Sequence, residues 1–425
     1  MTGVAPRLAD ALEPVLGGPL PVRLTAWDGS SAGPADAPHV RLLDRAALRR
    51  LIWRPGELGA AQAYVRGEID VDGRLDDALR HAWSVVGERG LSARRPPVRH
   101  LARAATVAIR EGAFGPPPPA PPSQVRVRGR LHSRTRDRDV IRQHYDLTTD
   151  FYALILDDRM TYSSAYVTHG DLGGEESAAY SLADAQRDKL DLVCRKVGLD
   201  RGGRRLLDVG CGWGALSLYA AQTYGARVTG VTISAEQHAY VTERARRLGL
   251  EDRVEIRLQD YRDVDDGPYD AVASLEMGEH AGDAGYPAYV ETLRRNVAED
   301  GRVLVQQMSR PRGKHPGGGP FIESFIAPDM TMRPLADTVA LIEAGGLDVV
   351  DTEEMGLHYA WTVRAWQRRF EANRDAIRRL VGDEVVRVWE LYLAGGLLTF
   401  EQGRMGVDQI VARRRGARSQ PGTSS

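Results

Sequence analysis

Hydrophobic and polar positions along the chain change their pattern near residue 204. Beyond that point, short apolar runs alternate with stretches in which apolar residues recur every three or four positions, a pattern that predicts strands separated by helices. The predicted strands are 205–209, 227–232, 254–258, 269–275 and 302–306, and the predicted helices between them are 215–224 and 235–249. This alternation favours an α/β fold with a mostly parallel sheet and helices on both faces.

The chain before residue 115 has a different pattern. Strand-like pieces at 21–27 and 39–43, with helical pieces at 44–53 and 75–86, predict a small α+β domain over 1–114. The run GPPPPAPPS that follows can form neither helices nor sheet ladders, so we expect a linker at 115–124. The larger domain then spans 125–413, and the Arg-, Ser- and Gly-rich end, 414–425, is expected to be a disordered tail.

Charge and composition exclude several classes of function. The formal net charge of -1 gives no overall attraction to nucleic acid, and the two cysteines exclude a disulfide framework or a cysteine zinc cluster. No metal site is therefore expected. No apolar run reaches the roughly 18 residues that cross a bilayer, and the first residues make a poor signal peptide. We expect a cytoplasmic protein.

Candidate chemistry begins directly after the first predicted strand of the larger domain. Gly210, Gly212 and Gly214 follow Asp208 in the order D-x-G-x-G-x-G, with Trp213 between the last two glycines. Glycine is required where the backbone turns sharply or approaches a ligand closely. Because ligands of such sheets bind at the carboxyl ends of strands, this loop is a candidate cofactor site, although its spacing differs from that of the dinucleotide loop.

The next two predicted strands also end in polar residues. Thr232, Ser234 and Gln237 follow the second strand, where a dinucleotide site would carry an acidic residue. Asp260 and Tyr261 follow the third, where a carboxylate could accept a hydrogen bond from an adenine amino group and the ring could pack on the base. Three strand ends of this kind in register predict one shared cofactor pocket.

Five ordered motifs resemble those of a known family. They are LDVGCGWG (207–214), VTISAEQ (231–237), HYDLTTDFY (144–152), MTYSSAY (160–166) and MGEHAG (277–282). Over about 130–412 the chain resembles the cyclopropane-fatty-acyl-phospholipid synthases and mycolic acid cyclopropane synthases, and Gly56 to Gly73 resembles the amino-terminal domain of the phospholipid enzymes. The resemblance implies a class I (Rossmann-like) methyltransferase sheet and S-adenosylmethionine as methyl donor. It adds Tyr162 and Ser163 to the expected cofactor contacts.

The chemistry that the resemblance implies is methylation of the double bond of an unsaturated acyl chain, with phospholipid as the expected substrate. Transfer leaves a carbocation, and loss of a proton gives a cyclopropane ring or a methylene branch. Aromatic faces stabilise cations; the candidates for this wall are Tyr145, Tyr162, Tyr166, Tyr359, Trp361 and Trp366. Glu279, after the fourth strand, is the favoured catalytic residue, and Glu276 is the competing carboxylate.

The family's bicarbonate site adds three more candidates but is altered in this chain. Tyr359 is kept, whereas the family's cysteine becomes Ser164, its histidine becomes Gln306 and its isoleucine becomes Met308. Serine and glutamine still offer hydrogen-bond donors, so two alternatives are open. Bicarbonate could remain as a second small ligand, or the proton could leave to Glu279 or to water.

The resemblance also carries expectations about the protein's surroundings. An insertion near 310–335 is expected to cover the acyl pocket, and the amino-terminal domain to serve lipid contact or oligomerisation, as in a homodimer. The protein would then be peripheral to the inner face of the membrane. Because the fold alone does not set the substrate, a C- or N-methyltransferase of a small metabolite is the alternative, and a non-enzymatic lipid carrier is a third.

Overall fold

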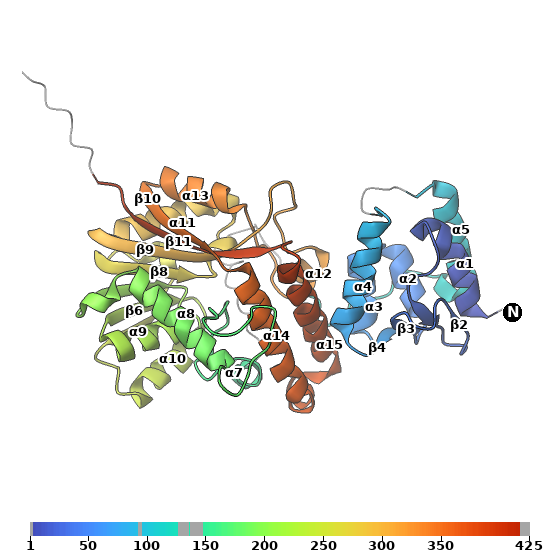
Figure 1. Ribbon diagram of the computed structural model, residues 1–425, viewed down its shortest axis with the longest axis horizontal. Helices are drawn as coiled ribbons and strands as arrows, with labels where there is room; N and C mark the ends of the chain where they lie inside the picture. Colours follow the sequence, from blue (N-terminus) through green and yellow to red (C-terminus); the bar gives the residue numbers. More distant parts are fainter. Residues whose placement is uncertain (1–2, 92–95, 126–135, 137–147, 417–425) are drawn as a thin grey trace, which may run out of the picture. The chain divides into compact units, whose positions relative to one another are not determined.

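The computed structural model describes residues 3–91, 96–125, 136 and 148–416 (Figure 1). Contacts between residues divide the chain into two compact units. Unit 1 comprises Met1–Arg126, Gly319–Ile326 and Arg374–Leu398, and unit 2 comprises Val127–Gly318, Ala327–Asn373 and Thr399–Ser425. The segment 310–335, expected to cover an acyl pocket, is thus shared between the units, and most of the predicted tail lies outside the described residues.

Unit 1 is an α+β assembly around a small mixed sheet. The strand order is β2-β1-β3-β4, with β1 parallel to β3 and antiparallel to β2. Its strands are β1 (Arg23–Thr25), β2 (Ser31–Ala32), β3 (His39–Leu42) and β4 (Ile69–Asp72). Its helices are α1 (Val4–Leu16), α2 (Ala46–Trp53), α3 (Glu57–Val65), α4 (Leu75–Glu88), α5 (Val98–Ala108), α12 (Pro320–Phe325) and most of α15 (Arg374–Glu401).

The Pro-rich segment is attached to unit 1 through its backbone. Trp53 Nε1 donates to the carbonyl of Gly115 at 3.0 Å, and Arg50 Nη1 donates to the carbonyl of Pro119 at 2.8 Å. Ser123 N donates to Glu384 Oε1 at 2.7 Å. Because a polyproline-like chain makes no internal hydrogen bonds, its carbonyls are available to accept from such donors.

Unit 2 is built on a seven-stranded sheet with the order β10-β11-β9-β8-β5-β6-β7. The strands are β5 (Arg205–Val209), β6 (Arg227–Thr232), β7 (Val254–Leu258), β8 (Tyr269–Leu275), β9 (Val297–Ser309), β10 (Leu347–Glu354) and β11 (Gly406–Arg414). β5 pairs in parallel with both β6 and β8, whereas β11 is antiparallel to its two neighbours. The chain leaves β5 first toward one edge and then toward the other, which opens a crevice at the carboxyl ends of β5 and β8.

Helices cover both faces of this sheet, as the sequence predicts (Figure 1). α8 (Leu182–Lys196), α9 (Ala215–Tyr224) and α10 (Ala235–Arg247) pack on one face, and α11 (Gly282–Asn296) and α13 (Leu335–Ala344) pack on the other. The adjacent residues Leu206 and Leu207 enter opposite cores because strand side chains alternate between faces. Short α7 (Thr149–Ala153) and long α14 (Gly356–Ala372) are the other described α-helices that lie wholly in unit 2.

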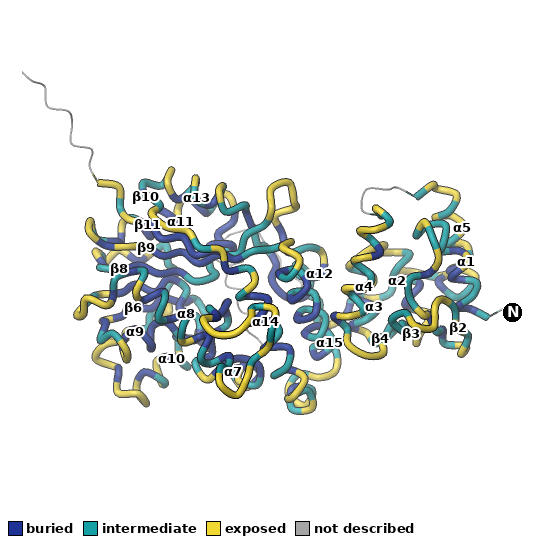
Figure 2. The backbone as a smooth tube through the Cα atoms, in the orientation of Figure 1, coloured by how far each residue is buried: buried dark blue, intermediate teal, exposed yellow. Residues whose placement is uncertain are grey.

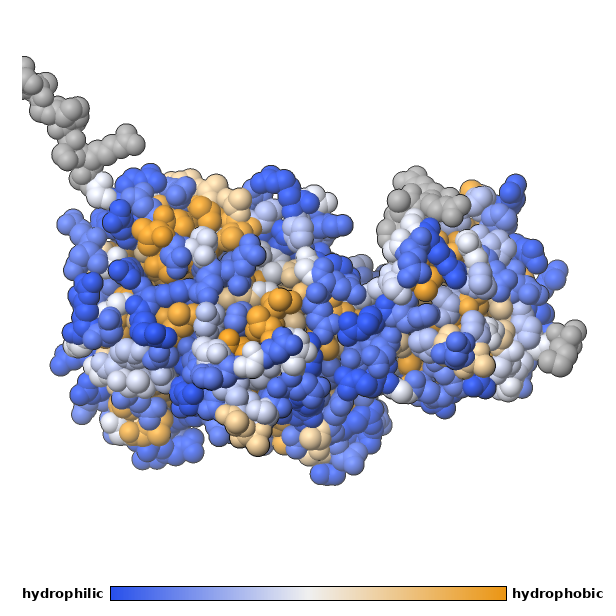
Figure 3. All heavy atoms as spheres, in the orientation of Figure 1, coloured by the Kyte–Doolittle hydropathy of each residue, from blue (hydrophilic) through white to orange (hydrophobic). Residues whose placement is uncertain are grey.

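Burial and hydropathy agree with this layering. Figure 2 shows the central strands of unit 2 buried over most of their length. Figure 3 shows hydrophilic side chains over most of the visible surface, with hydrophobic ones gathered in patches. Within the described ranges, no helix is both long enough and apolar enough to cross a membrane.

Candidate functional site

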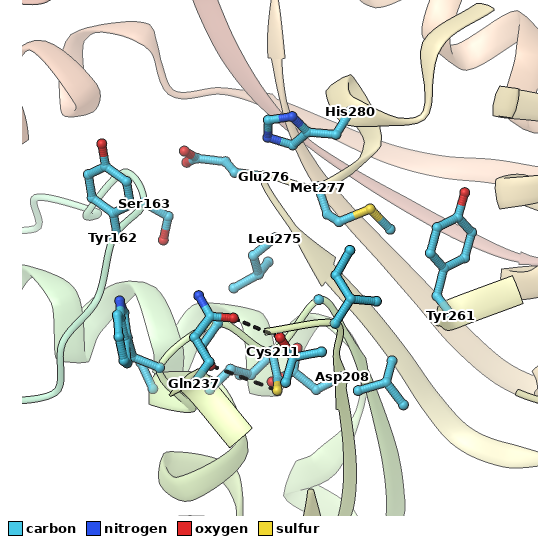
Figure 4. Close-up of a pocket in the computed structure, with 18 of the residues that line it drawn as sticks. Tyr162, Ser163, Asp208, Cys211, Gln237, Tyr261, Leu275, Glu276, Met277 and His280 are labelled. Atoms are coloured by element: carbon cyan, nitrogen blue, oxygen red, sulfur yellow. Dashed lines mark hydrogen bonds between the residues drawn. The ribbon is translucent and has the colours of Figure 1, made fainter. Parts of the chain in front are cut away.

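A pocket in unit 2 opens at the carboxyl ends of β5, β6 and β8 (Figure 4). Its lining includes the glycine loop between β5 and α9, in which Gly210, Gly212 and Gly214 all have positive φ, from 52° to 77°. A Cβ atom on Gly214 would lie 2.4 Å from Val241 Cγ1 of α10, so only glycine fits there. The loop thus keeps the end of β5 open for a ligand.

Ten of the twelve residues predicted for cofactor binding line this pocket. They are Tyr162, Ser163, Asp208, Gly210, Gly212, Trp213, Thr232, Gln237, Asp260 and Tyr261. The other two do not line the pocket. Gly214 shapes the loop, and the Ser234 hydroxyl caps α10 by accepting from Gln237 N at 3.3 Å. Figure 4 shows Tyr162 and Tyr261 on opposite sides of the pocket. Contact of these residues with a cofactor stays a prediction.

Opposite charges are buried at the pocket wall. Asp208 Oδ2 accepts from the Ser217 hydroxyl at 2.7 Å, and burial raises the pKa of Asp208 to about 6. Lys189 Nζ donates to Ser163 Oγ at 2.9 Å, and burial lowers the pKa of Lys189 to about 8 although Glu276 and Asp208 act in the other direction. Such shifts are typical of functional sites, and these two groups suit a ligand that carries both charges.

Backbone strain is also concentrated at this pocket. Among the described residues other than glycine, Met160, Glu276 and Asp329 have positive φ, at 60°, 52° and 66°, and all three line the pocket. A side chain in this conformation costs energy and persists where the surrounding structure enforces it, which occurs mainly at functional sites. At Glu276 the strained backbone follows directly after β8 and directs the carboxylate toward the Ser163 and Tyr162 side of the pocket (Figure 4).

Three of the four predicted catalytic residues converge on Glu276. Ser164 N and Gln306 Nε2 each donate to Glu276 Oε1 at 2.8 Å, and the Tyr359 hydroxyl donates to Oε2 at 2.8 Å. Burial raises the pKa of Glu276, whereas these donors and Lys189 lower it. The result is a half-buried carboxylate whose anion is stabilised by hydrogen bonds and whose pKa is raised by burial, as suits a group that accepts a proton.

Glu279, the favoured catalytic residue in the sequence, lies behind this arrangement. It is 1% exposed, and it is not among the residues that line the pocket. Burial and the charge of Glu276 raise the pKa of Glu279 to about 8, so its carboxyl is mainly protonated at neutral pH. Its backbone carbonyl accepts from Thr331 N at 2.8 Å and holds the following loop. A catalytic role for Glu279 stays a prediction.

A second row of side chains fixes the orientation of the Gln306 amide. Gln409 Nε2 of β11 donates to Gln306 Oε1 at 3.0 Å, and Lys196 Nζ donates to Gln409 Oε1 at 2.9 Å. Lys196 carries only donors, so it fixes which end of the Gln409 amide is the oxygen. Gln409 in turn leaves Gln306 only its NH2 group to present to Glu276.

Aromatic rings form a wall from the glycine loop to the Glu276 carboxylate. The Tyr162 ring lies 5.4 Å from the rings of both Tyr152 and Trp366, and Tyr152 lies 5.8 Å from Trp213. Tyr359, which holds Glu276, lies 5.9 Å from Trp366. The structure thus brings together Tyr162, Tyr359 and Trp366 of the predicted wall.

The other predicted aromatic residues do not join this wall. The Tyr166 hydroxyl donates to Glu353 at 2.8 Å and its ring stacks on His358, while Trp361 lies beside Tyr180. Tyr145 lies outside the described residues. Tyr152 belongs to this wall as well. It is part of the motif HYDLTTDFY, but the sequence did not predict this role for it.

Comparison with known proteins shows the family to which the sequence belongs. The sequence matches the family described as mycolic acid cyclopropane synthetase over residues 132–410. It is 34% identical to a "Probable fatty acid methyltransferase" of Pseudomonas putida, with 92% of each chain covered. It is 36% identical to "Tuberculostearic acid methyltransferase UfaA1" of Mycobacterium tuberculosis, with 93% of this chain and 88% of the relative covered.

Solved structures give the same assignment. A crystal structure of mycolic acid cyclopropane synthase CmaA1, complexed with SAH and CTAB, superposes with a TM-score of 0.59 and 29% identity, covering 65% of this chain and 98% of that chain. The predicted class I methyltransferase fold is confirmed. This chain belongs to the mycolic acid cyclopropane synthetase family, and it is an S-adenosylmethionine-dependent methyltransferase that acts on lipids.

Proposed function

We propose that the enzyme methylates a carbon–carbon double bond in an unsaturated acyl chain of a phospholipid, and that Glu276 accepts the proton released. The product would be a cyclopropane or a methylene-branched acyl chain. The observation that carries this proposal is the Glu276 carboxylate, held by three donors beside the cofactor pocket and the aromatic wall. An alkene carbon has no acidic heteroatom proton to lose, so the reaction needs a base only after the methyl group has been transferred.

The residues divide the chemistry between them. When bound, S-adenosylmethionine supplies an electrophilic methyl group, and its C–S bond breaks as the alkene π pair forms the new C–C bond. The ring of Tyr162, which lines the pocket with Trp366 packed behind it, offers its face to the positive charge that develops on carbon, without acting as a nucleophile. Glu276 then takes a proton from the transferred methyl group. The electron pair of that C–H bond closes the ring or, if a hydride has first shifted from the methyl-bearing carbon to the neighbouring cationic carbon, forms the methylene double bond.

The same contacts argue against a separate bicarbonate ion. Ser164, Gln306 and Tyr359 stand at the family's bicarbonate positions, and in this chain their donors are occupied by the two oxygens of Glu276. A second anion there would lie against the Glu276 carboxylate, to which Ser164 N and the Tyr359 hydroxyl already donate the one hydrogen that each has. The residues therefore do not fit bicarbonate, and the side chain itself supplies a carboxylate of similar geometry.

Expression in a bacterium that has unsaturated phospholipids tests the substrate assignment. We expect some acyl chains to gain one CH2 unit, measured by mass spectrometry of the fatty acid methyl esters, with an empty-vector strain as control. Hydrogenation then separates the products, since a methylene branch takes up hydrogen more readily than a ring. If no acyl chain changes while the purified enzyme methylates a water-soluble acceptor, the acyl-chain assignment is wrong.

A prediction for the second row follows from the fixed amide orientation. In Gln409→Leu, Gln306 Oε1 loses its donor and the Gln306 amide can turn its oxygen toward Glu276. Losing the Nε2 donor raises the pKa of Glu276 further, so we expect turnover to fall about tenfold at neutral pH and the acid limb of the pH–rate profile to move to higher pH. Affinity for S-adenosylmethionine should not change.

Gln307→Leu is the matched control, because Gln307 is the next residue of β9 and accepts instead from the Tyr286 hydroxyl at 2.8 Å. It should leave the pH–rate profile in place even if it lowers stability. A Gln409→Leu enzyme whose pH profile coincides with the wild type would show that Gln409 does not orient Gln306.

A further inference from the structure

Large apolar side chains are exposed around α5 in unit 1. Of eleven such exposed side chains among the described residues, five lie on α5, directly after it or at the neighbouring end of α2. They are Trp53, Val98, Leu101, Ile109 and Phe114. Val98 and Phe114 are the most exposed of all eleven, at 79% and 81%. Scattered apolar residues on a surface need no explanation, but a gathering of this kind marks an interaction site.

Helical spacing places three of these residues on one side of α5. Val98, Leu101 and Ile109 are separated by three and eight positions, which brings them within about 80° of one another around a helix axis at 100° per residue. The opposite side of α5 carries Val107, which is half-buried against the core of unit 1, and α5 packs against α1. The helix therefore has one apolar face inside unit 1 and a second one exposed.

Arginines form a second exposed flank of α5, which Ala102 and Thr106 separate from the apolar stripe around the helix axis. Arg99, Arg103 and Arg110 are four and seven positions apart, which again places them on one side of the helix, and all three are exposed. The one carboxylate in residues 98–114, Glu111, is bound to Arg7 by two hydrogen bonds of 2.7 and 2.9 Å. The flank is therefore positively charged.

We propose that α5 docks unit 1 on the surface of a lipid bilayer that contains anionic lipids. The apolar stripe would enter the boundary between headgroups and acyl chains, and the arginines would meet the lipid phosphates. Trp53 suits this boundary, because its ring is half exposed while its Nε1 is already satisfied by the Gly115 carbonyl. A second copy of this chain fits the surface less well. Its own face would bring the same arginines, and residues 98–114 would offer no available carboxylate to pair with them. The choice of a lipid partner rests on the proposed function.

Vesicle flotation of the full-length protein tests the docking. We expect wild type to float with phosphatidylcholine vesicles that contain phosphatidylglycerol and to bind weakly to phosphatidylcholine alone. Leu101→Gln with Ile109→Gln should lower the partition coefficient at least tenfold on the mixed vesicles. Arg99→Gln with Arg103→Gln should lower it about fivefold for each arginine, on the mixed vesicles only.

The matched control is Leu258→Gln with Val350→Gln, two side chains of unit 2 that are 55% and 50% exposed. It removes comparable exposed apolar surface and should float like the wild type. Circular dichroism checks that each variant is folded. If the Leu101/Ile109 variant floats like the wild type, the docking proposal is overturned. It is also overturned if light scattering shows that this variant only loses a self-associated state while its vesicle binding is kept.

A separate readout distinguishes this proposal from the proposed function. On phospholipid dispersed in detergent, the Leu101/Ile109 variant should methylate at the wild-type rate, because no bilayer has to be found. Loss of activity there as well would assign the stripe to something other than bilayer docking. Wild-type protein that floats but never methylates an acyl chain would leave the docking in place and contradict the proposed function.

Discussion

Replacing Glu276 with glutamine is expected to lower the rate of formation of the final product by about 10²- to 10⁴-fold, the range typical of a lost general base. The amide cannot accept a proton, although it nearly keeps the shape of the carboxylate and its one oxygen can still accept from Ser164 N. Affinity for S-adenosylmethionine, measured by titration calorimetry, should stay close to that of the wild type. Because the active form is the anion and burial raises the pKa of Glu276, wild-type activity should fall as pH decreases through a value above the usual range for Glu.

Glu279→Gln is the control for this substitution. Glu279 is buried three residues away and mainly protonated at neutral pH, so its amide variant resembles the native state, and we expect less than about a tenfold change. A Glu279→Gln enzyme with the large defect and a Glu276→Gln enzyme without it would return the catalytic role to Glu279.

Glu276→Gly adds a chemical rescue. The positive φ at this position suits glycine, and the substitution frees the donors of Ser164, Gln306 and Tyr359. Added formate or bicarbonate should restore part of the activity of Glu276→Gly and should not stimulate the wild type. Wild-type activity that depends on added bicarbonate would contradict the assignment of Glu276 as the base.

Asp208→Asn is expected to weaken S-adenosylmethionine binding at neutral pH by at least about tenfold, as the loss of one buried charge contact does. S-adenosylmethionine carries a sulfonium and an ammonium, and either charge, if bound near Asp208, would favour the ionised carboxylate. Because the pKa of Asp208 in the free enzyme is about 6, wild-type affinity should rise as pH increases from 5 to 7, and calorimetry at both pH values should show that rise.

The same substitution should alter the pH dependence of stability. The pKa of Asp208 is about 6 in the folded protein and 3.8 in the unfolded chain. Protonated Asp208 therefore stabilises the fold fully below pH 3.8, and this stabilisation is lost as pH rises through about 6. The difference corresponds to on the order of 3 kcal/mol, and Asp208→Asn should flatten this decline in the cofactor-free protein. Asp270→Asn, in an ion pair with Arg204 at 2.7 Å, should leave cofactor affinity unchanged. Unchanged affinity in Asp208→Asn would mean that this carboxylate does not face the cofactor's charge.

The central sheet of unit 2 was predictable because its signals are local. The first four predicted strands of the larger domain coincide with β5 to β8, since each is a compact apolar run between helical stretches. β10 and β11 were missed. β10 is an edge strand whose sequence LDVVDTEE is largely polar. β11 lies between β9 and β10 and is antiparallel to both, so the alternation of strands and helices that indicates a parallel sheet does not predict it. α1 was also missed, although Val4 and Leu8 pack into the core at helical spacing, with Leu12 packed against it.

The site shows where sequence reasoning stopped. Residue types and strand ends indicated the pocket, because carboxyl ends of parallel strands share one edge. The choice between Glu276 and Glu279 depends on the positive φ at Glu276, which turns that side chain into the pocket and which spacing does not reveal. The donor that Gln306 presents depends on Gln409, more than 100 residues later and adjacent only through the antiparallel pairing of β11 with β9.

The most direct test of the account is the fate of the methyl hydrogens. Purified enzyme would be given S-adenosylmethionine with a CD3 methyl group and an unsaturated phospholipid, and the acyl products would be analysed by mass spectrometry. If Glu276 removes a proton from the transferred methyl group, the product keeps two deuterium atoms, as CD2 in a ring or a methylene branch. An acyl chain or small acceptor that keeps all three deuterium atoms would contradict this account.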